Sequence, residues 1–217
     1  MSIADDRRTR FRFAFLALSA LVLMPFAAAR ADVKHTTFAV MRNGEQIGTN
    51  TIAIERTGSQ TSVDVRTHIA VTLAFVTVYR FDQTLNEQWS DRQLMSLQTR
   101  TDDNGSVHQT RAGRTGEQFA VRADDRDSEA PAAVIPLDLW NPAVLTQTQV
   151  LDPKDGSLVP LRVVDHGDDE LPGGAGHAHH YTITTTFSQD VWYDKAGDLV
   201  GVQITGRDGS VIRYQRA

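Results

Sequence analysis

One short run of the chain carries side chains that bind metals or transfer protons. His177, His179 and His180 lie within four residues, and the run HGDDE at residues 166–170 lies just upstream. Imidazoles beside carboxylates suit zinc, copper or nickel. The preceding run PGGAG at residues 172–176 offers no outer shell to fix such ligands. The pattern favours a solvated loop that enters a strand, and the alternative is an envelope metal-binding protein or enzyme that uses these three histidines.

Signatures of the common hydrolases and nucleotide-binding proteins do not occur in the sequence. It contains no G-x-S-x-G, no H-E-x-x-H and no glycine-rich loop that ends in Gly-Lys-Ser/Thr. Paired carboxylates such as Asp102-Asp103 fall in predicted turns, where charges are usually solvated. Cysteine is absent, which excludes a disulfide framework, a thiolate metal site and a cysteine nucleophile. Catalysis is therefore disfavoured, no catalytic residue is assigned, and no cofactor is predicted.

Aromatic and small apolar side chains give a different candidate site. Trp and Tyr along one curved sheet could line a cleft for an apolar small molecule or lipid. The residues that we predict to line it are Ala74, Val76, Tyr79, Trp140 and Trp192. The alternative is that the aromatic members are ordinary core residues of a β-domain, where such side chains are favoured.

The central element that must position these side chains runs over residues 63–81. Apolar residues or Thr occupy its odd positions, and charged residues flank it at even positions, which is the period of a β-strand. At about 3.3 Å per residue this run would extend about 60 Å, several times the usual strand length. We therefore expect a bend or a short helical turn near Thr72–Phe75. In the middle, both faces are apolar, so a helix, a loop or a ligand must cover the second face.

Turn signals divide the rest of the chain at intervals of about ten residues. Asn43-Gly44 and Asn104-Gly105 are typical of tight β-hairpins. The polar residues 123–133 are predicted to form a surface loop. Asn141-Pro142 combines an N-cap residue with proline at the first helical position and predicts a short helix near Trp140, which would partly cover the central element. The predicted fold is all-β: a single antiparallel twisted sheet of ten to twelve strands, curled into an open or half barrel, with this one helix.

The first 31 residues are typical of a secretory signal peptide. Four arginines precede an apolar run over residues 13–29, and Ala29-Arg30-Ala31 matches an A-x-A cleavage site. The apolar run is short for a membrane-spanning helix, which needs about 20 residues. We predict cleavage after Ala31, no transmembrane anchor afterwards, and a periplasmic or secreted protein. The remaining residues 32–217 are expected to form a single β-rich domain.

The charge of the chain argues against one class of partner. Loss of residues 1–31 would remove five Arg and two Asp and move the formal net charge from −5 to −8. Nucleic-acid binding depends on clustered Lys and Arg that neutralise phosphates. An acidic mature chain without a polybasic run therefore predicts no nucleic-acid partner.

Several short motifs resemble an uncharacterised family of exported bacterial β-proteins, which is catalogued only as a domain of unknown function. They are Val78-Tyr79-Arg80-Phe81, Glu87-Gln88-Trp89, residues 101–105, Leu139-Trp140-Asn141, Leu151-Asp152 with Gly156, Val191-Trp192-Tyr193-Asp194 and residues 208–214. The family brings no established activity. Its strand succession is distantly similar to that of periplasmic lipoprotein carriers, whose sheet curls into a half-barrel around a lipid cavity. From the sequence as a whole we predict a non-catalytic envelope protein that binds, carries or scaffolds, with a possible cleft for an apolar ligand.

Overall fold

The computed structural model describes residues 31–174, 176–206 and 208–217. The predicted signal peptide therefore lies almost wholly outside the described residues. The strands are β1 Asp32–Arg42, β2 Glu45–Thr57, β3 Gln60–Leu73, β4 Val76–Ser90, β5 Gln93–Asp103, β6 Ser106–Thr115, β7 Gln118–Ala123, β8 Arg126–Pro131, β9 Gln149–Leu151, β10 Leu158–Pro160, β11 Arg162–Glu170, β12 His177–Thr184, β13 Ser188–Tyr193, β14 Leu199–Thr205 and β15 Val211–Arg216. One 3-10 helix, η1, spans Pro142–Thr146.

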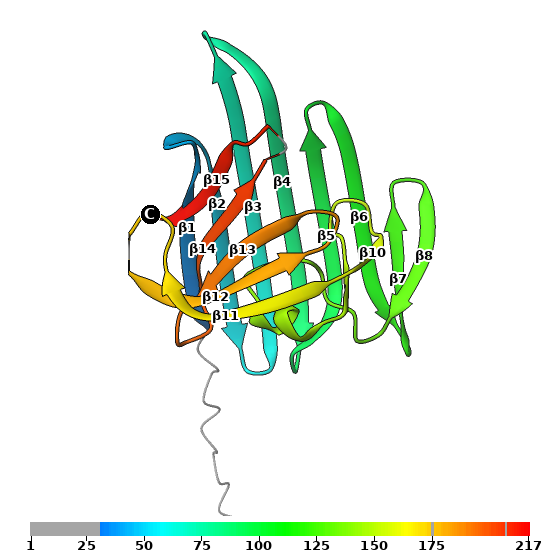
Figure 1. The fold of residues 1–217 in the computed structure, drawn as a ribbon. Coiled ribbons are helices and arrows are strands. Elements are labelled where there is room, and N and C mark those ends of the chain that lie inside the picture. The colour runs from blue at the N-terminus through cyan, green and yellow to red at the C-terminus, as the bar shows by residue number, and fades with distance from the viewer. Residues whose placement is uncertain (1–30, 175, 207) are drawn as a thin grey trace, which may run out of the picture.

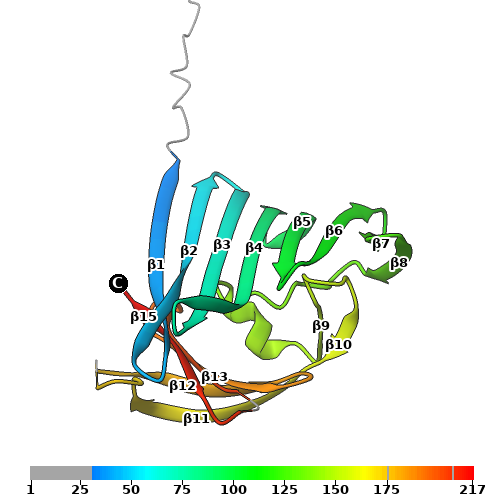
Figure 2. The same ribbon diagram turned by 90° about the horizontal axis from the view of Figure 1, so that it is seen from above.

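Most strands belong to a single antiparallel sheet, which confirms the predicted fold class. Its thirteen strands follow the order β11-β12-β13-β14-β15-β1-β2-β3-β4-β5-β6-β7-β8, and β9 and β10 form a separate pair. The sheet curves so that a long arm, β1 to β8, faces a short arm, β11 to β15 (Figures 1 and 2). Since β8 and β11 end the order without pairing with each other, the barrel is open.

A segment that we call the plug, residues 132–161, lies between the two arms. It carries η1, β9 and β10 (Figure 2). Val144, Val150 and Leu151 of the plug are completely buried. They join one core with inward side chains of both arms, among them Phe38, Leu97, Ile183 and Val191. The apolar faces of both arms are thus buried against the plug, which is the main stabilising feature of a sheet this open.

The predicted helix near Trp140 is confirmed in place and capping, as a single 3-10 turn. The Asn141 side-chain oxygen accepts a hydrogen bond from the Ala143 N–H at 3.0 Å, and Pro142 begins the helix. The prediction that this helix partly covers the central element is wrong: the helix does not lie on the apolar middle of that element. Val144 instead packs into the core between the arms. The second apolar face is left in solvent, because the plug enters the inside of the curved sheet.

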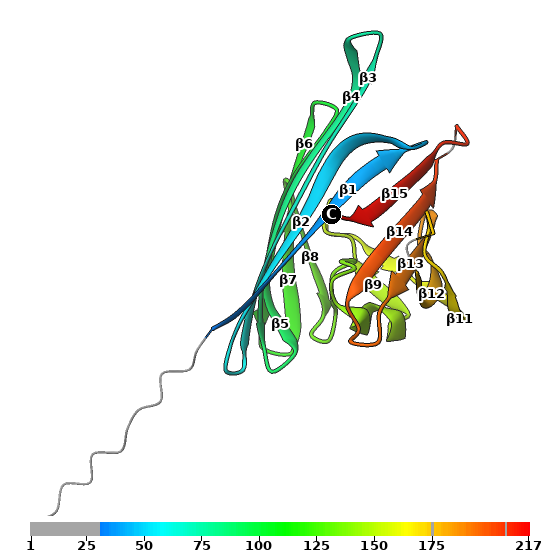
Figure 3. The same ribbon diagram turned by 90° about the vertical axis from the view of Figure 1, so that its left-hand side faces the viewer.

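The central element is two strands of one hairpin. The expected bend is a two-residue turn at Ala74 and Phe75, both with left-handed φ values, 46° and 70°. The last β2–β3 pair is Gly48 with Ile69, and the first β4–β5 pair is Phe81 with Asp103. Residues 70–79 therefore pair only with partners within their own hairpin and project beyond the sheet (Figure 3).

Two segments that we predicted to be loops contain strands, and the sheet therefore has more strands than the ten to twelve expected. Residues 126–131 form β8, and residues 165–170 belong to β11. Both are edge strands, with one side unpaired, and charged residues on such edges oppose pairing with other chains. A polar composition therefore did not separate loop from edge strand. In the described part of the chain, no helix is long and apolar enough to cross a membrane.

Candidate functional site

A cleft lies between the long arm, the short arm and the plug. Its volume is about 230 Å³, somewhat below the usual range for ligand pockets. Strands β2, β3 and β4 form one wall, β13, β14 and β15 form the other, and the plug contributes residues 137–139 and Pro153. The lining is mainly apolar and includes Ile52, Val65, Phe81, Leu85, Leu199, Val202 and Ile204. Such a surface can bury an alkyl or ring system.

Two amide side chains of the cleft donate to threonine hydroxyls. Asn50 donates to the Thr67 hydroxyl at 2.8 Å, and Gln83 donates to the Thr101 hydroxyl at 2.9 Å. Asp138 differs from them. Its Oδ1 accepts a weak hydrogen bond of 3.4 Å from the Trp140 N–H, and its Oδ2 is buried without a hydrogen-bond partner. Asp138 is therefore a lining residue of the cleft with a buried, unused acceptor.

A second buried carboxyl group, that of Glu87 on β4, lies beside this wall. Glu87 is completely buried. The indole N–H groups of Trp89 and Trp140 both donate to its Oε2, at 2.6 and 2.9 Å, and the two indole rings pack edge to face with centroids 5.7 Å apart. Its Oε1 has no hydrogen-bond partner. Two tryptophans from different elements thus clamp one oxygen of a carboxyl group in the core.

Burial raises the pKa of both carboxyl groups. Desolvation raises the pKa of Glu87 to about 8, and the nearby Asp138 charge raises it further against the lowering effect of the two indole donors. Desolvation also raises the pKa of Asp138 to about 6. The Tyr193 hydroxyl donates to the Leu139 carbonyl at 2.9 Å, and burial raises its pKa as well. At neutral pH, the pair of carboxyl groups therefore retains a proton.

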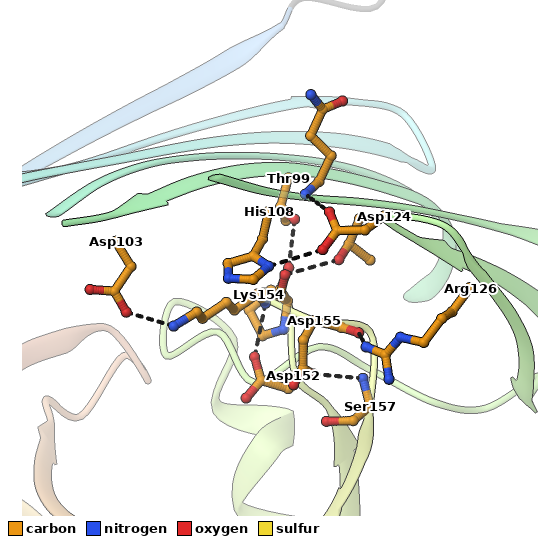
Figure 4. A network of polar contacts seen from close by, with 12 residues as sticks. Thr99, Asp103, His108, Asp124, Arg126, Asp152, Lys154, Asp155 and Ser157 are labelled. Atoms are coloured by element: carbon orange, nitrogen blue, oxygen red, sulfur yellow. Dashed lines mark hydrogen bonds and ion pairs between the residues drawn. The ribbon is translucent and has the colours of Figure 1, made fainter. Parts of the chain in front are cut away.

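Polar contacts fix residues 152–157 of the plug against the long arm (Figure 4). Lys154 forms a 2.6 Å ion pair with Asp103. The hydroxyl groups of Thr99 and Thr110 donate to the carbonyls of Pro153 and Lys154, at 2.5 and 3.2 Å. Gly156 has φ 68°, and a Cβ there would lie 2.8 Å from a methyl group of Val121, so the loop needs glycine to approach β7. The cleft wall is held by these contacts.

The three histidines of the alternative metal site do not converge. The register places His179 opposite Tyr193 and His180 opposite Trp192, so these two imidazoles lie on opposite faces of the sheet. His180 stacks on Trp192 at 4.3 Å and lies 3.2 Å from Asp190, and His177 is exposed at the start of β12. No group of three His, Cys, Asp or Glu side chains suited to a metal ion occurs among the described residues.

The five predicted ligand-binding residues do not gather in one place. Ala74, Val76 and Tyr79 are exposed on the projecting hairpin. Trp192 is buried against His180 on the face opposite Tyr193. Trp140 lies next to the candidate site, through its hydrogen bond to Glu87. None of the five is among the described residues that line the cleft.

Sequence reasoning missed Glu87 and Asp138, although the first left a signal. Glu87 stands between Leu85 and Trp89 at the same parity, which puts a carboxyl group on the inward face of β4. A charged residue at an inward position is unusual, because burial of an unpaired charge is costly. Asp138 left no such signal, since its partner lies 51 residues away.

Comparison with known protein families identifies the family of this chain. A family described as a domain of unknown function, DUF6134, matches residues 38–217. The chain belongs to the DUF6134 family. This DUF6134 protein is also similar to the solved structure of a beta-barrel-like protein of domain of unknown function DUF1849 from Brucella abortus, with a TM-score of 0.60 and 9% identity over 84% of this chain and 94% of the other. At that identity the likeness shows the fold alone. No curated protein matches the DUF6134 chain.

Proposed function

We propose that the protein is an exported, non-catalytic carrier or binding protein of the cell envelope that holds an apolar small molecule or lipid in the cleft between its arms. The observation that carries this proposal is the cleft itself, a mainly apolar space of about 230 Å³ walled by six strands and the plug. Each CH₂ group that a ligand buries there would contribute about 0.8 kcal/mol. The signal-peptide pattern at residues 1–31 supports export to the periplasm or beyond.

The half-barrel architecture is consistent with this role. A curved sheet with an occupied concave side resembles the periplasmic lipoprotein carriers, which hold lipid in that position. Here the plug fills much of the concave side and leaves the cleft beside it. A scaffold without a ligand is the competing function, and it predicts that the cleft stays empty in solution.

Calorimetric titration with 1-octanol, a neutral alkyl ligand, tests the proposal. Ile204 lines the cleft and is only partly buried, so Ile204→Trp should fill the space and abolish binding while the protein remains folded. Val76→Trp makes a similar enlargement at the exposed hairpin and should leave binding unchanged. Native mass spectrometry of protein purified from the envelope should show a bound apolar molecule.

Circular dichroism of each variant separates blocked binding from loss of structure. Overpacking costs about 1–3 kcal/mol in a closed core, so a strong destabilisation by Ile204→Trp would indicate that the cleft is too tight for a ligand. Absence of any binding to the unmodified protein would remove the carrier function and leave the scaffold.

A further inference from the structure

The cleft is lined by an acidic side chain and by no basic one among the described residues. Asp138 is the one carboxylate that lines it, and no Lys, Arg or His is among the described lining residues. Tyr214 also lines it, and burial raises the pKa of its hydroxyl to about 12, so it stays neutral. A ligand that brings a carboxylate or phosphate would therefore meet no cation and one acid.

Asp138 is also an unpartnered hydrogen-bond acceptor in the wall of the cleft. The amide N–H groups of Asn50 and Gln83 already donate to threonine hydroxyls. The Asp138 Oδ2 has no donor. A buried acceptor without a partner destabilises a protein. A ligand that donates a hydrogen bond at this point would relieve that loss.

We infer that the cleft selects apolar ligands whose polar end is a hydrogen-bond donor, an alkylamine before an alcohol, and rejects fatty acids of the same length. This inference rests on the proposed carrier function. An ammonium group has three N–H donors and no acceptor, so it complements Asp138 in both hydrogen bonding and charge. A carboxylate of equal chain length would place like charges together in a poorly solvated site, where they repel more strongly than in water.

The position of Asp138 is consistent with a preference for cationic ligands. Asp138 lies in the plug between Leu137 and Leu139, which also line the cleft, so its carboxyl group is set in an apolar wall. Hydrogen bonds hold its neighbours in place: the Leu137 N–H donates to the Leu151 carbonyl, and the Tyr193 hydroxyl donates to the Leu139 carbonyl, both at 2.9 Å. An acid in an apolar wall attracts a cationic head group more strongly than the same acid in water does.

Calorimetric titration at pH 7 with octylamine, 1-octanol and octanoate tests the inference, because the three share one alkyl chain. We expect octylamine to bind at least about tenfold more tightly than octanoate, with octanol between them. In Asp138→Asn the ratio of the amine to the acid should fall to about twofold or less. Asp125→Asn removes an exposed acid in the turn before β8, outside the cleft, and should leave the ratio unchanged.

The alcohol separates the two possible failures. If octanol binds and octanoate binds as tightly as octylamine, the donor selectivity is wrong while the carrier function stands. If octanol and the other two all fail to bind, the carrier function fails and the inference with it. Should Asp138→Asn not fold, the ranking in the unmodified protein still decides, because equal affinities for amine and acid overturn the inference.

Discussion

The base and the tip of the β3–β4 hairpin both carry apolar side chains at strand spacing, and their surroundings are opposite. At the base, Val65 and Leu85 are 7% and 2% exposed, and at the tip Leu73 and Phe75 are 57% and 103% exposed. The base is flanked by β2 and β5 and covered by the plug, whereas residues 70–79 pair with neither β2 nor β5. The comparison teaches that alternation decides whether a segment is a strand, while topology decides whether its apolar face is buried.

The largest expected difference between the two regions is in stability. Trp89→Ala should lower the free energy of unfolding by about 3–5 kcal/mol, because it opens a cavity in the core and removes a donor from Glu87. Phe75→Ala, at the tip, should change it by less than about 0.5 kcal/mol. Urea denaturation measures both, and equal effects would mean that the tip is covered in solution.

The second prediction uses pH to probe the base. The pKa of Glu87, about 8 in the folded protein, lies above its ordinary value of 4.5, so the folded state binds more protons between these values. Asp138 acts in the same direction up to about pH 6. The free energy of unfolding should therefore fall as the pH rises from about 4.5 to 8, by more than about 1 kcal/mol.

Glu87→Gln should remove the slope between pH 6 and 8 and about half of the slope between pH 4.5 and 6, where Asp138 still titrates. Gln retains an oxygen that can accept from the two indoles but has no proton to lose. Glu45→Gln, an exposed substitution in β2, serves as the control and should keep the whole slope. A slope between pH 6 and 8 that survives Glu87→Gln would assign the titration to another group.

The smallest expected effect concerns the turn at the tip. Ala74 and Phe75 have left-handed φ values. The turns at Asn43-Gly44 and Asn104-Gly105 have such φ values too, but Asn and Gly adopt them at little cost. Replacing Ala74-Phe75 with Asn-Gly should therefore raise the free energy of unfolding by about 1 kcal/mol. The reverse exchange at Asn43-Gly44 should lower it. Thermal unfolding measures both, and no gain at the tip would show that the tip opens independently of the sheet.

Local signals in the sequence predicted much of the fold. The alternation of residues 63–81, the Asn-Gly turns and the Asn141-Pro142 cap gave the strands, the hairpins and the single helical turn, since each depends on neighbouring residues alone. The candidate site could not be predicted in this way. Glu87 and Asp138 come together only when the plug enters the curved sheet, and no local pattern specifies that docking.

The pairing of β1 with β15 has a consequence for the order in which the molecule can form. Phe38 of β1 pairs with Arg216 of β15. β1 therefore gains its second neighbouring strand only after β15, the last described strand, has been made. Contacts between residues so distant in the chain slow folding, because a long loop must close before they form. Until β15 is made, the short arm cannot pair with the centre of the sheet. If the protein is exported, as we propose, this delay would keep a newly made chain unfolded for longer and so able to cross a membrane as an extended chain.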